Sequence, residues 1–219
     1  MCTPAAETGA QFQHLASSMG VSLTRVTGGS VPALLAGCRP NTRMILVESP
    51  ANPGLATLDL RTLAAACHLR GKCAGPILGL AGAARTAHTG AALRRHAANA
   101  HAIAAMLRRQ FAWLDWTGAW NGADARRNRV RTRLHTGLMA LHFAHRGQGG
   151  AFVDALQDIP VLPSFGNPET GVFHYGGVVE DADALAACEI PPGLVRLSVG
   201  IEDPRDLLAA LVPALRRVS

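Results

Sequence analysis

The chain has 219 residues, of which 48% are hydrophobic and 16% are charged. This composition excludes an intrinsically disordered polyampholyte, because chains that stay unfolded contain far fewer apolar residues. The net charge of +6 comes almost wholly from arginine, since Lys72 is the only lysine. The sequence has no run of about 18 apolar residues, so it predicts no membrane span.

The cysteines and the first residues indicate the compartment. The five cysteines are odd in number, widely spaced and form no C-x-x-C pair, which favours a reducing compartment over a disulfide framework. The first residues show neither the basic segment nor the apolar segment of a secretory signal peptide. We therefore expect a cytoplasmic protein.

Helix and strand patterns alternate in the first third of the sequence. Residues 21–26 alternate between apolar and polar side chains, as a strand does. Residues 44–47 form a short apolar run that predicts a buried parallel strand. This order predicts a doubly wound α/β layer. Helices are predicted at residues 11–19, 31–36 and 60–69, the last with Asp59 as its N-cap.

The second part of the sequence has an antiparallel-leaning α+β pattern. Its clearest helix covers residues 91–110 and places apolar side chains on one face. We expect a domain boundary near residues 84–90, which gives domains of residues 1–85 and 86–219. Strands are predicted at residues 76–80, 113–120, 138–143 and 194–199, and helices at residues 150–156 and 204–215, the last with Asp203 as its N-cap.

Two residue patterns that could hold a metal or a phosphate are incomplete. His142 and His145 are the closest pair of histidines, but they are predicted to face different directions, and no carboxylate or cysteine completes a ligand set. The sequence therefore predicts no metal site. Gly75, Gly79 and Gly82 have the spacing of neither a dinucleotide fingerprint nor a P-loop, so they are interpreted as loop and packing residues.

Two further patterns offer alternative functions. Ser49, Ser164 and His174 are side chains that hydrolases use, but the sequence has no G-x-S-x-G elbow. The densest run of positive charge could contact phosphates, so a non-enzymatic basic module that binds acidic partners or nucleic acid is one alternative. A solvated face is the opposing interpretation, and no neighbouring aromatic residue offers a platform for bases. The run consists of Arg126, Arg127, Arg129, Arg131 and Arg133.

Five segments, in collinear order, resemble the motifs of one enzyme family. Residues 42–53 end in E-S-P-A-N-P, and residues 193–203 read G-L-V-R-L-S-V-G-I-E-D. The other three segments are residues 94–104, with N-A-H-A-I-A at their end, residues 152–156 (F-V-D-A-L) and residues 163–170 (P-S-F-G-N-P-E-T). The chain thus resembles the Cys/Met-metabolism pyridoxal-phosphate enzymes, a family that includes cystathionine γ-synthase, cystathionine lyases and methionine γ-lyase.

The resemblance implies a fold and a chemistry. The implied fold is α/β: a partial aspartate-aminotransferase-like large domain, the remnant of a cofactor-binding domain, followed by a long linking helix and an α+β small domain. The implied cofactor is pyridoxal 5'-phosphate. The implied activity is that of a lyase or transferase, namely β- or γ-elimination or replacement on sulfur amino acids such as cystathionine.

The resemblance also implies roles for three residues. Asn52 matches a residue that approaches the cofactor's 3-hydroxyl group. Arg196 matches the residue that clamps the α-carboxylate of the substrate, a task for which a bidentate guanidinium is suited. Ser164 matches a residue near that same carboxylate.

The match has a gap where the family carries its catalytic groups. The lysine that forms the Schiff base, the aspartate that pairs with the ring nitrogen and the serines and threonines that hold the phosphate have no counterpart, and Lys72 matches a loop between a helix and a strand. No catalytic residue is therefore assigned, and we expect impaired catalysis unless a partner chain supplies the lysine. Because an interrupted sheet exposes strand edges, we also expect a homo-oligomer or a partner chain.

Overall fold

The computed structural model describes residues 6–26, 30–69, 90–118 and 135–219. The chain divides into two compact units, residues 1–78 and 79–219. Residues 70–89, which contain this division, the domain boundary expected after residue 85 and the strand expected at residues 76–80, lie outside the described ranges. No helix within those ranges is long and apolar enough to cross a membrane.

The regular structure described in the first unit consists of helices that follow the sequence prediction closely. Asp59 caps the third helix, where its carboxylate accepts a hydrogen bond of 3.0 Å from the backbone N–H of Thr62. The helices are α1 (Ala6–Ser18), α2 (Val31–Ala36) and α3 (Leu60–Leu69). A small apolar core joins α2, α3 and the loop between them through Val31, Leu34, Ala51, Leu58, Leu63 and Cys67.

The two strands expected in the first unit do not form, so that prediction was wrong. Residues 21–26 and 44–47 belong to no strand or bridge. Ile45 and Val47 pack against the small core, whereas Met44 is 59% exposed and Leu46 46% exposed. Within the apolar run of residues 44–47, alternate side chains therefore face the small core. A strand also needs a hydrogen-bonded neighbour, and no described residue of this unit supplies one.

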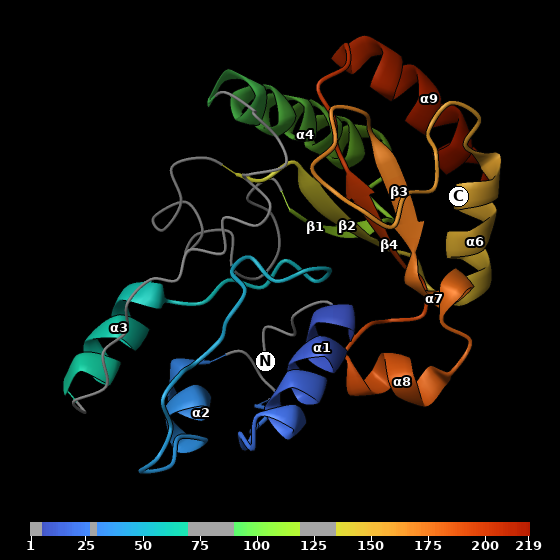
Figure 1. The fold of residues 1–219 in the computed structure, drawn as a ribbon. Helices are drawn as coiled ribbons and strands as arrows, with labels where there is room; N and C mark the ends of the chain where they lie inside the picture. Colours follow the sequence, from blue (N-terminus) through green and yellow to red (C-terminus); the bar gives the residue numbers. More distant parts are fainter. Residues whose placement is uncertain (1–5, 27–29, 70–89, 119–134) are drawn as a thin grey trace. The chain divides into compact units, whose positions relative to one another are not determined.

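The second unit contains a four-stranded antiparallel sheet (Figure 1). The strands are β1 (Asp115–Gly118), β2 (Leu138–His142), β3 (Gly171–His174) and β4 (Leu194–Ser198), in the order β1-β2-β4-β3. The strands predicted near residues 113–120, 138–143 and 194–199 are thus confirmed. The sequence prediction missed β3, which is only four residues long.

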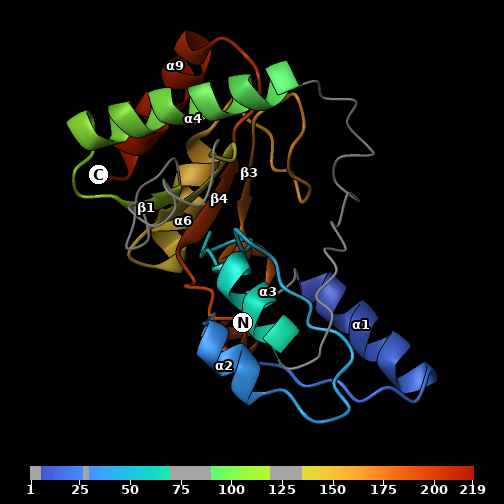
Figure 2. The same cartoon turned by 90° about the vertical axis from the view of Figure 1, so that its left-hand side faces the viewer.

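Three helices cover one face of this sheet. They are α4 (Gly90–Gln110), α6 (Arg146–Ala155) and α9 (Pro204–Arg217), and Figure 2 shows α4 and α9 running across the same end of the sheet. The buried side chains of Met139, Leu141, Val195 and Leu197 form one core with side chains of these helices, among them Ile103, Leu107, Phe152, Leu211 and Leu215. The alternate residues of β2 and β4, such as Ala140 and Arg196, therefore point to the opposite face.

Short helices connect the last two strands. α7 (Tyr175–Val178) follows β3 directly, and α8 (Ala182–Ala187) precedes the loop that leads to β4. The closing helix α9 begins as predicted, because the Asp203 carboxylate accepts a hydrogen bond of 2.8 Å from the backbone N–H of Arg205.

Candidate functional site

The central polar residue of the second unit is Arg196, in the middle of β4. Its neighbours across the sheet are Ala140 on β2 and Phe173 on β3. Arg196 is only 3% exposed. A buried guanidinium is costly unless its N–H groups find acceptors, so its contacts determine what it can do.

The guanidinium of Arg196 donates mainly to the backbone of one loop. Its Nη2 lies 3.1 Å from the carbonyl oxygen of Leu162, 2.9 Å from that of Pro163 and 3.0 Å from that of Ser164. Its Nη1 donates to the hydroxyl of Tyr175 at 3.2 Å. Arg196 thus fastens the loop that precedes β3 to the centre of the sheet.

Aromatic rings complete the surroundings of this guanidinium. Its central carbon lies 5.2 Å from the ring centre of Phe165, 5.3 Å from that of Phe173 and 5.9 Å from that of Tyr175. Cation–π attraction at such distances stabilises the charge. Burial lowers the pKa of Arg196, while the charge and the hydrogen bond of Tyr175 act in the opposite direction.

The structure brings Ser164 and Arg196 together, but through the backbone of Ser164. The Ser164 hydroxyl is engaged elsewhere, since it accepts a hydrogen bond of 3.0 Å from Nδ2 of Asn167. No sequence motif pointed to Phe165, Phe173 or Tyr175 as neighbours of Arg196. The signal that could have found them is the concentration of three of the chain's few aromatic residues within and next to β3.

The motif of residues 193–203 around Arg196 makes contacts that stabilise the fold. A Cβ atom at Gly200 would lie 2.2 Å from the carbonyl oxygen of Pro168, so only glycine fits there. The backbone N–H of Gly200 donates to the hydroxyl of Thr170 at 2.8 Å. Glu202 in turn accepts hydrogen bonds from that hydroxyl, at 3.0 Å, and from the backbone N–H of Thr170.

The matching motif on α4 binds the same segment. Nδ2 of Asn99 donates to the carbonyl oxygens of Gly200 at 3.1 Å and of Glu202 at 2.8 Å. Nδ1 of His96 lies 2.7 Å from the carbonyl oxygen of Val199, which can only accept, so this nitrogen carries a proton. Two of the five motifs therefore meet in space and hold the end of β4.

Asn52 belongs to the first unit. It is 5% exposed and lies in a tight loop, where the backbone N–H of Ala51 donates to the carbonyl of Ala56 at 2.8 Å. Burial raises the pKa of the nearby Glu48 carboxyl, and a hydrogen bond from the backbone of Asn52 partly offsets this. Asn52 and Arg196 lie in different units, and the roles that the resemblance implies for them stay predictions.

The histidine pair and the serines give no second site in the described residues. His142 accompanies Thr117, whose hydroxyl lies 3.3 Å from its Nε2, whereas Nδ1 of His145 caps α6 by accepting from Gln148 N at 3.1 Å. No group of three metal-ligating side chains occurs in this part of the chain. The Ser49 hydroxyl accepts from Leu58 N at 3.0 Å and makes no described contact to a histidine.

Two of the sequence predictions fall on residues that the structure does not describe. Lys72 lies within residues 70–89, and the arginine run lies within residues 119–134, both outside the described ranges. Their roles stay predictions.

Comparisons with known proteins show which enzymes this chain is similar to. Residues 6–76 match the model of the Cys/Met metabolism PLP-dependent enzymes. An L-methionine gamma-lyase of Pseudomonas putida is 26% identical over 275 residues, which cover 94% of this chain and 69% of that protein. The chain is thus similar to this family of pyridoxal-phosphate enzymes. A second L-methionine gamma-lyase, from Streptomyces avermitilis, is 50% identical over 52 residues, which cover 24% of this chain and 12% of that protein.

Solved structures share the fold of this chain. A crystal structure of MetB from Corynebacterium glutamicum has a TM-score of 0.79 and 21% identity, and covers 97% of this chain and 72% of that chain. The O-acetylhomoserine sulfhydrylase of Wolinella succinogenes has a TM-score of 0.74 and 17% identity, with 95% of this chain and 81% of that chain covered. The predicted fold class, a partial PLP-dependent transferase fold with an α+β second part, is confirmed.

Proposed function

We propose that this chain keeps the fold and the carboxylate-handling side chains of a trans-sulfuration enzyme but not the covalent cofactor chemistry. The surroundings of Arg196 carry this proposal. A guanidinium that clamps a carboxylate offers it two parallel N–H groups. Here one terminal nitrogen donates to the three carbonyl oxygens of residues 162–164, and the other donates to Tyr175. In this conformation Arg196 therefore stabilises the contact between that loop and β4.

The residues present do not fit a covalently held cofactor. Pyridoxal phosphate, the cofactor of the family, works through an imine to a lysine and a carboxylate beside its ring nitrogen. The described residues include no lysine, and the sequence next to Lys72 (Gly71, Cys73, Ala74, Gly75) offers neither a carboxylate nor hydroxyl groups for a phosphate. No catalytic step is therefore assigned to Asn52, Ser164 or Arg196.

The length of one alignment supports an internal gap. The match to the Pseudomonas putida enzyme extends over 275 residues, whereas this chain has 219. The aligned region of that enzyme thus contains positions without a counterpart here. This agrees with the proposal that the segment carrying the lysine is missing. From the similarity to an L-methionine gamma-lyase, we also propose that the substrates to which the fold was once suited are sulfur amino acids.

The decisive experiment adds pyridoxal phosphate to the purified chain and records its visible absorbance. Borohydride reduction and peptide mapping then locate any lysine adduct, and elimination from cystathionine and methionine is assayed in parallel. We expect no stable aldimine band and no turnover, because the only amine candidates are Lys72 and the N-terminus.

The variant Lys72→Ala is the matched control for that experiment. A stoichiometric band and measurable turnover in the parent, both lost in the variant, would overturn the proposal. Tight nucleic-acid binding with a steep salt dependence, in a protein that stays colourless, would instead favour the basic-module alternative centred on residues 126–133.

We also propose that the chain is cytoplasmic and self-associates. Cys38 and Cys67 form no disulfide bond among the described residues, which is compatible with a reducing compartment. The exposed side chains of Met44 and Leu46 alternate with partly buried ones along a segment that pairs with no strand among the described residues, which favours pairing with a second copy.

A further inference from the structure

The outer face of α4 in the second unit carries positive charge of one kind only. The helix has 21 residues and contains no aspartate or glutamate. Surface helices commonly combine both signs of charge, because opposite charges three or four residues apart stabilise a helix. This helix instead has four arginines, all of them exposed: Arg94, Arg95, Arg108 and Arg109.

The four arginines form two pairs on the same side of the helix. Fourteen positions separate Arg94 from Arg108, and Arg95 from Arg109, which is just under four turns and about 21 Å along the axis. A rod-like partner that lies along α4 can therefore contact both pairs. The accessible side chains between the pairs are mostly small: Ala98, His101, Ala102 and Ala105.

The described contacts of these guanidinium groups are with neutral partners. Nη2 of Arg95 donates to the backbone carbonyl of Glu202 at 3.4 Å, and Nε of Arg109 donates to a carbonyl of its own helix at 3.3 Å. The guanidinium carbon of Arg108 lies 5.0 Å from the ring centre of Trp116. These contacts orient the groups without neutralising them. Since a guanidinium has five N–H donors, most of the donors stay available to a partner.

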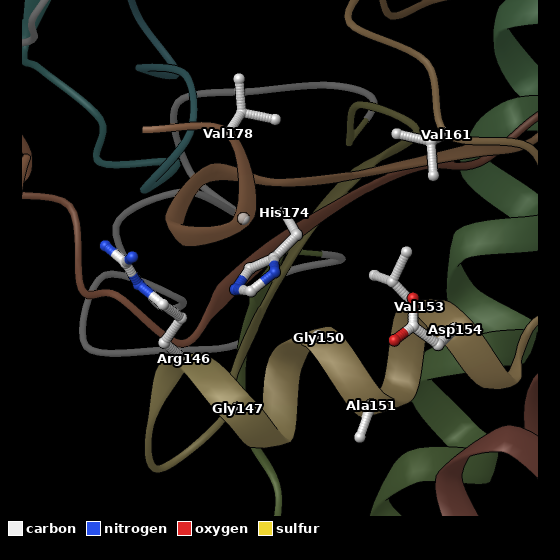
Figure 3. A pocket seen from close by; sticks show the side chains of 10 residues that line it. Arg146, Gly147, Gly150, Ala151, Val153, Asp154, Val161, His174 and Val178 are labelled. Atoms are coloured by element: carbon white, nitrogen blue, oxygen red, sulfur yellow. The ribbon is translucent and has the colours of Figure 1, made fainter. Parts of the chain in front are cut away.

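The carboxylates of the second unit gather in another part of it. Residues 147–195 contain seven aspartates and glutamates and no lysine or arginine. Figure 3 shows the change of sign along α6, with Arg146 in its first turn and Asp154 in its last. Figure 1 shows α4 and α8 at opposite ends of this unit. Such a separation of charge orients an approaching polyanion toward the α4 end. The exposed acidic residues around α8 are Glu180, Asp181, Asp183 and Glu189.

The composition of the α4 face favours one class of polyanion. Protein partners are held by aromatic and apolar anchors, and membrane surfaces by an apolar helix face, whereas alanines supply little of either. Single-stranded nucleic acid stacks on aromatic side chains, and residues 96–107 contain no phenylalanine, tyrosine or tryptophan. Guanidinium groups bind phosphate oxygens through paired N–H donors. We propose that the outer face of α4 binds the phosphate backbone of a nucleic-acid duplex, without reading its sequence.

The test measures the binding of a fluorescently labelled DNA duplex to the full chain, without pyridoxal phosphate, by anisotropy at several salt concentrations. We expect the affinity to fall as the salt concentration rises, because each phosphate contact releases a counterion. Arg94→Gln with Arg95→Gln should weaken binding at low salt about tenfold. It should also reduce the slope of log K against log salt by about 1.8, or about 0.9 for each lost contact. Arg108→Gln with Arg109→Gln should have the same effect.

Matched controls separate this face from net charge and from folding. Arg39→Gln with Arg61→Gln removes the same charge from exposed arginines of the first unit and should change neither the affinity nor the slope. Arg94→Lys with Arg95→Lys keeps the charge and should keep the slope. Thermal melts of all the variants check that they fold.

Four results would overturn the proposal. The first is the absence of duplex binding, and the second is an equal loss in the first-unit control, which would reflect net charge alone. The third is binding that is lost in Arg126→Gln with Arg127→Gln but unchanged in the α4 variants. The fourth is tighter binding to phosphatidylserine vesicles or to polyglutamate than to the duplex. None of these results bears on the absorbance test of cofactor binding, so the two proposals fail separately.

Discussion

The backbone carbonyl of Ser164 accepts a hydrogen bond of 3.0 Å from the guanidinium of Arg196. The family resemblance places these two residues around the carboxylate of a substrate, and here they contact each other directly. The guanidinium also donates hydrogen bonds to the carbonyl oxygens of Leu162 and Pro163, and together these bonds join the loop to the central strand β4. A guanidinium that is suited to bind a substrate carboxylate therefore stabilises the protein's own backbone here.

Replacing Arg196 by lysine should reduce stability strongly. An ammonium group cannot reach the three carbonyl oxygens and Tyr175 together, and it loses the stacking on flat aromatic rings. We expect a loss of about 3 kcal/mol in the free energy of unfolding, in the range for breaking a buried charged network. Urea unfolding followed by the fluorescence of the buried Trp116 measures this. Arg205→Lys, at an exposed position, serves as the control, and equal midpoints for the two variants would contradict the prediction.

The pair of Thr170 and Glu202 should behave as one energetic unit. The carboxylate accepts from both the hydroxyl and the backbone N–H of Thr170. A double-mutant cycle of Thr170→Val and Glu202→Gln is expected to show a coupling of about 1–2 kcal/mol. Glu169→Gln, next to Thr170 but exposed, should couple to Thr170→Val by less than about 0.3 kcal/mol. Additive losses for the Thr170–Glu202 pair would contradict this interpretation.

The sequence predicted much of the second unit because its signals are local. The apolar face of residues 91–110 and the capping residue Asp203 specify helices without reference to the rest of the chain. The strand at residues 194–199 was also predicted, in a segment where Val195, Leu197 and Val199 alternate with Arg196 and Ser198. β3 was not predicted, because its four residues are too few to show an alternation of apolar and polar side chains.

The first unit shows what local patterns cannot determine. The helix cap at Asp59 was found from its neighbours alone. The apolar run at residues 44–47 has the composition of a central strand, but a strand is completed by residues elsewhere in the chain. Likewise, the role of Arg196 depends on the carbonyl groups of residues 162–164, which are more than 30 positions away in the sequence. The motif at residues 163–170 pointed to the side chain of Ser164 and not to these carbonyl groups.

Self-association should depend on residues 44–47 of the first unit, which pair with no strand among the described residues. Met44→Lys combined with Leu46→Lys places charges on its exposed side and disfavours pairing with a second copy. We expect the parent to form dimers or larger species at high concentration by light scattering, and the double variant to be mostly monomeric. Val178→Lys, also at an exposed apolar residue but in the second unit, should leave the association unchanged. A monodisperse parent monomer with a cooperative melt would contradict the prediction.

Glu48 should make the first unit less stable at neutral pH than in acid. Its Oε2 is buried and has no hydrogen-bond partner among the described residues, and burial raises its pKa despite the bond from the Asn52 backbone. A carboxyl group whose pKa is higher in the folded state favours folding when protonated. This contribution is complete below the ordinary glutamate pKa of about 4.3 and is lost as the pH rises through the folded-state pKa.

Glu48→Gln, which removes the charge and keeps the shape, should therefore stabilise the first unit at pH 7. The gain should shrink as the pH falls and vanish near pH 4, where the parent carboxyl is itself neutral. Hydrogen exchange of the amides of α3, followed at both pH values, measures the stability of this unit separately from the second. Glu180→Gln, at an exposed position, provides the matched control and should change neither rate. A Glu48→Gln variant that exchanges faster than the parent at pH 7 would show that the ionised carboxylate is stabilised by contacts outside the described residues.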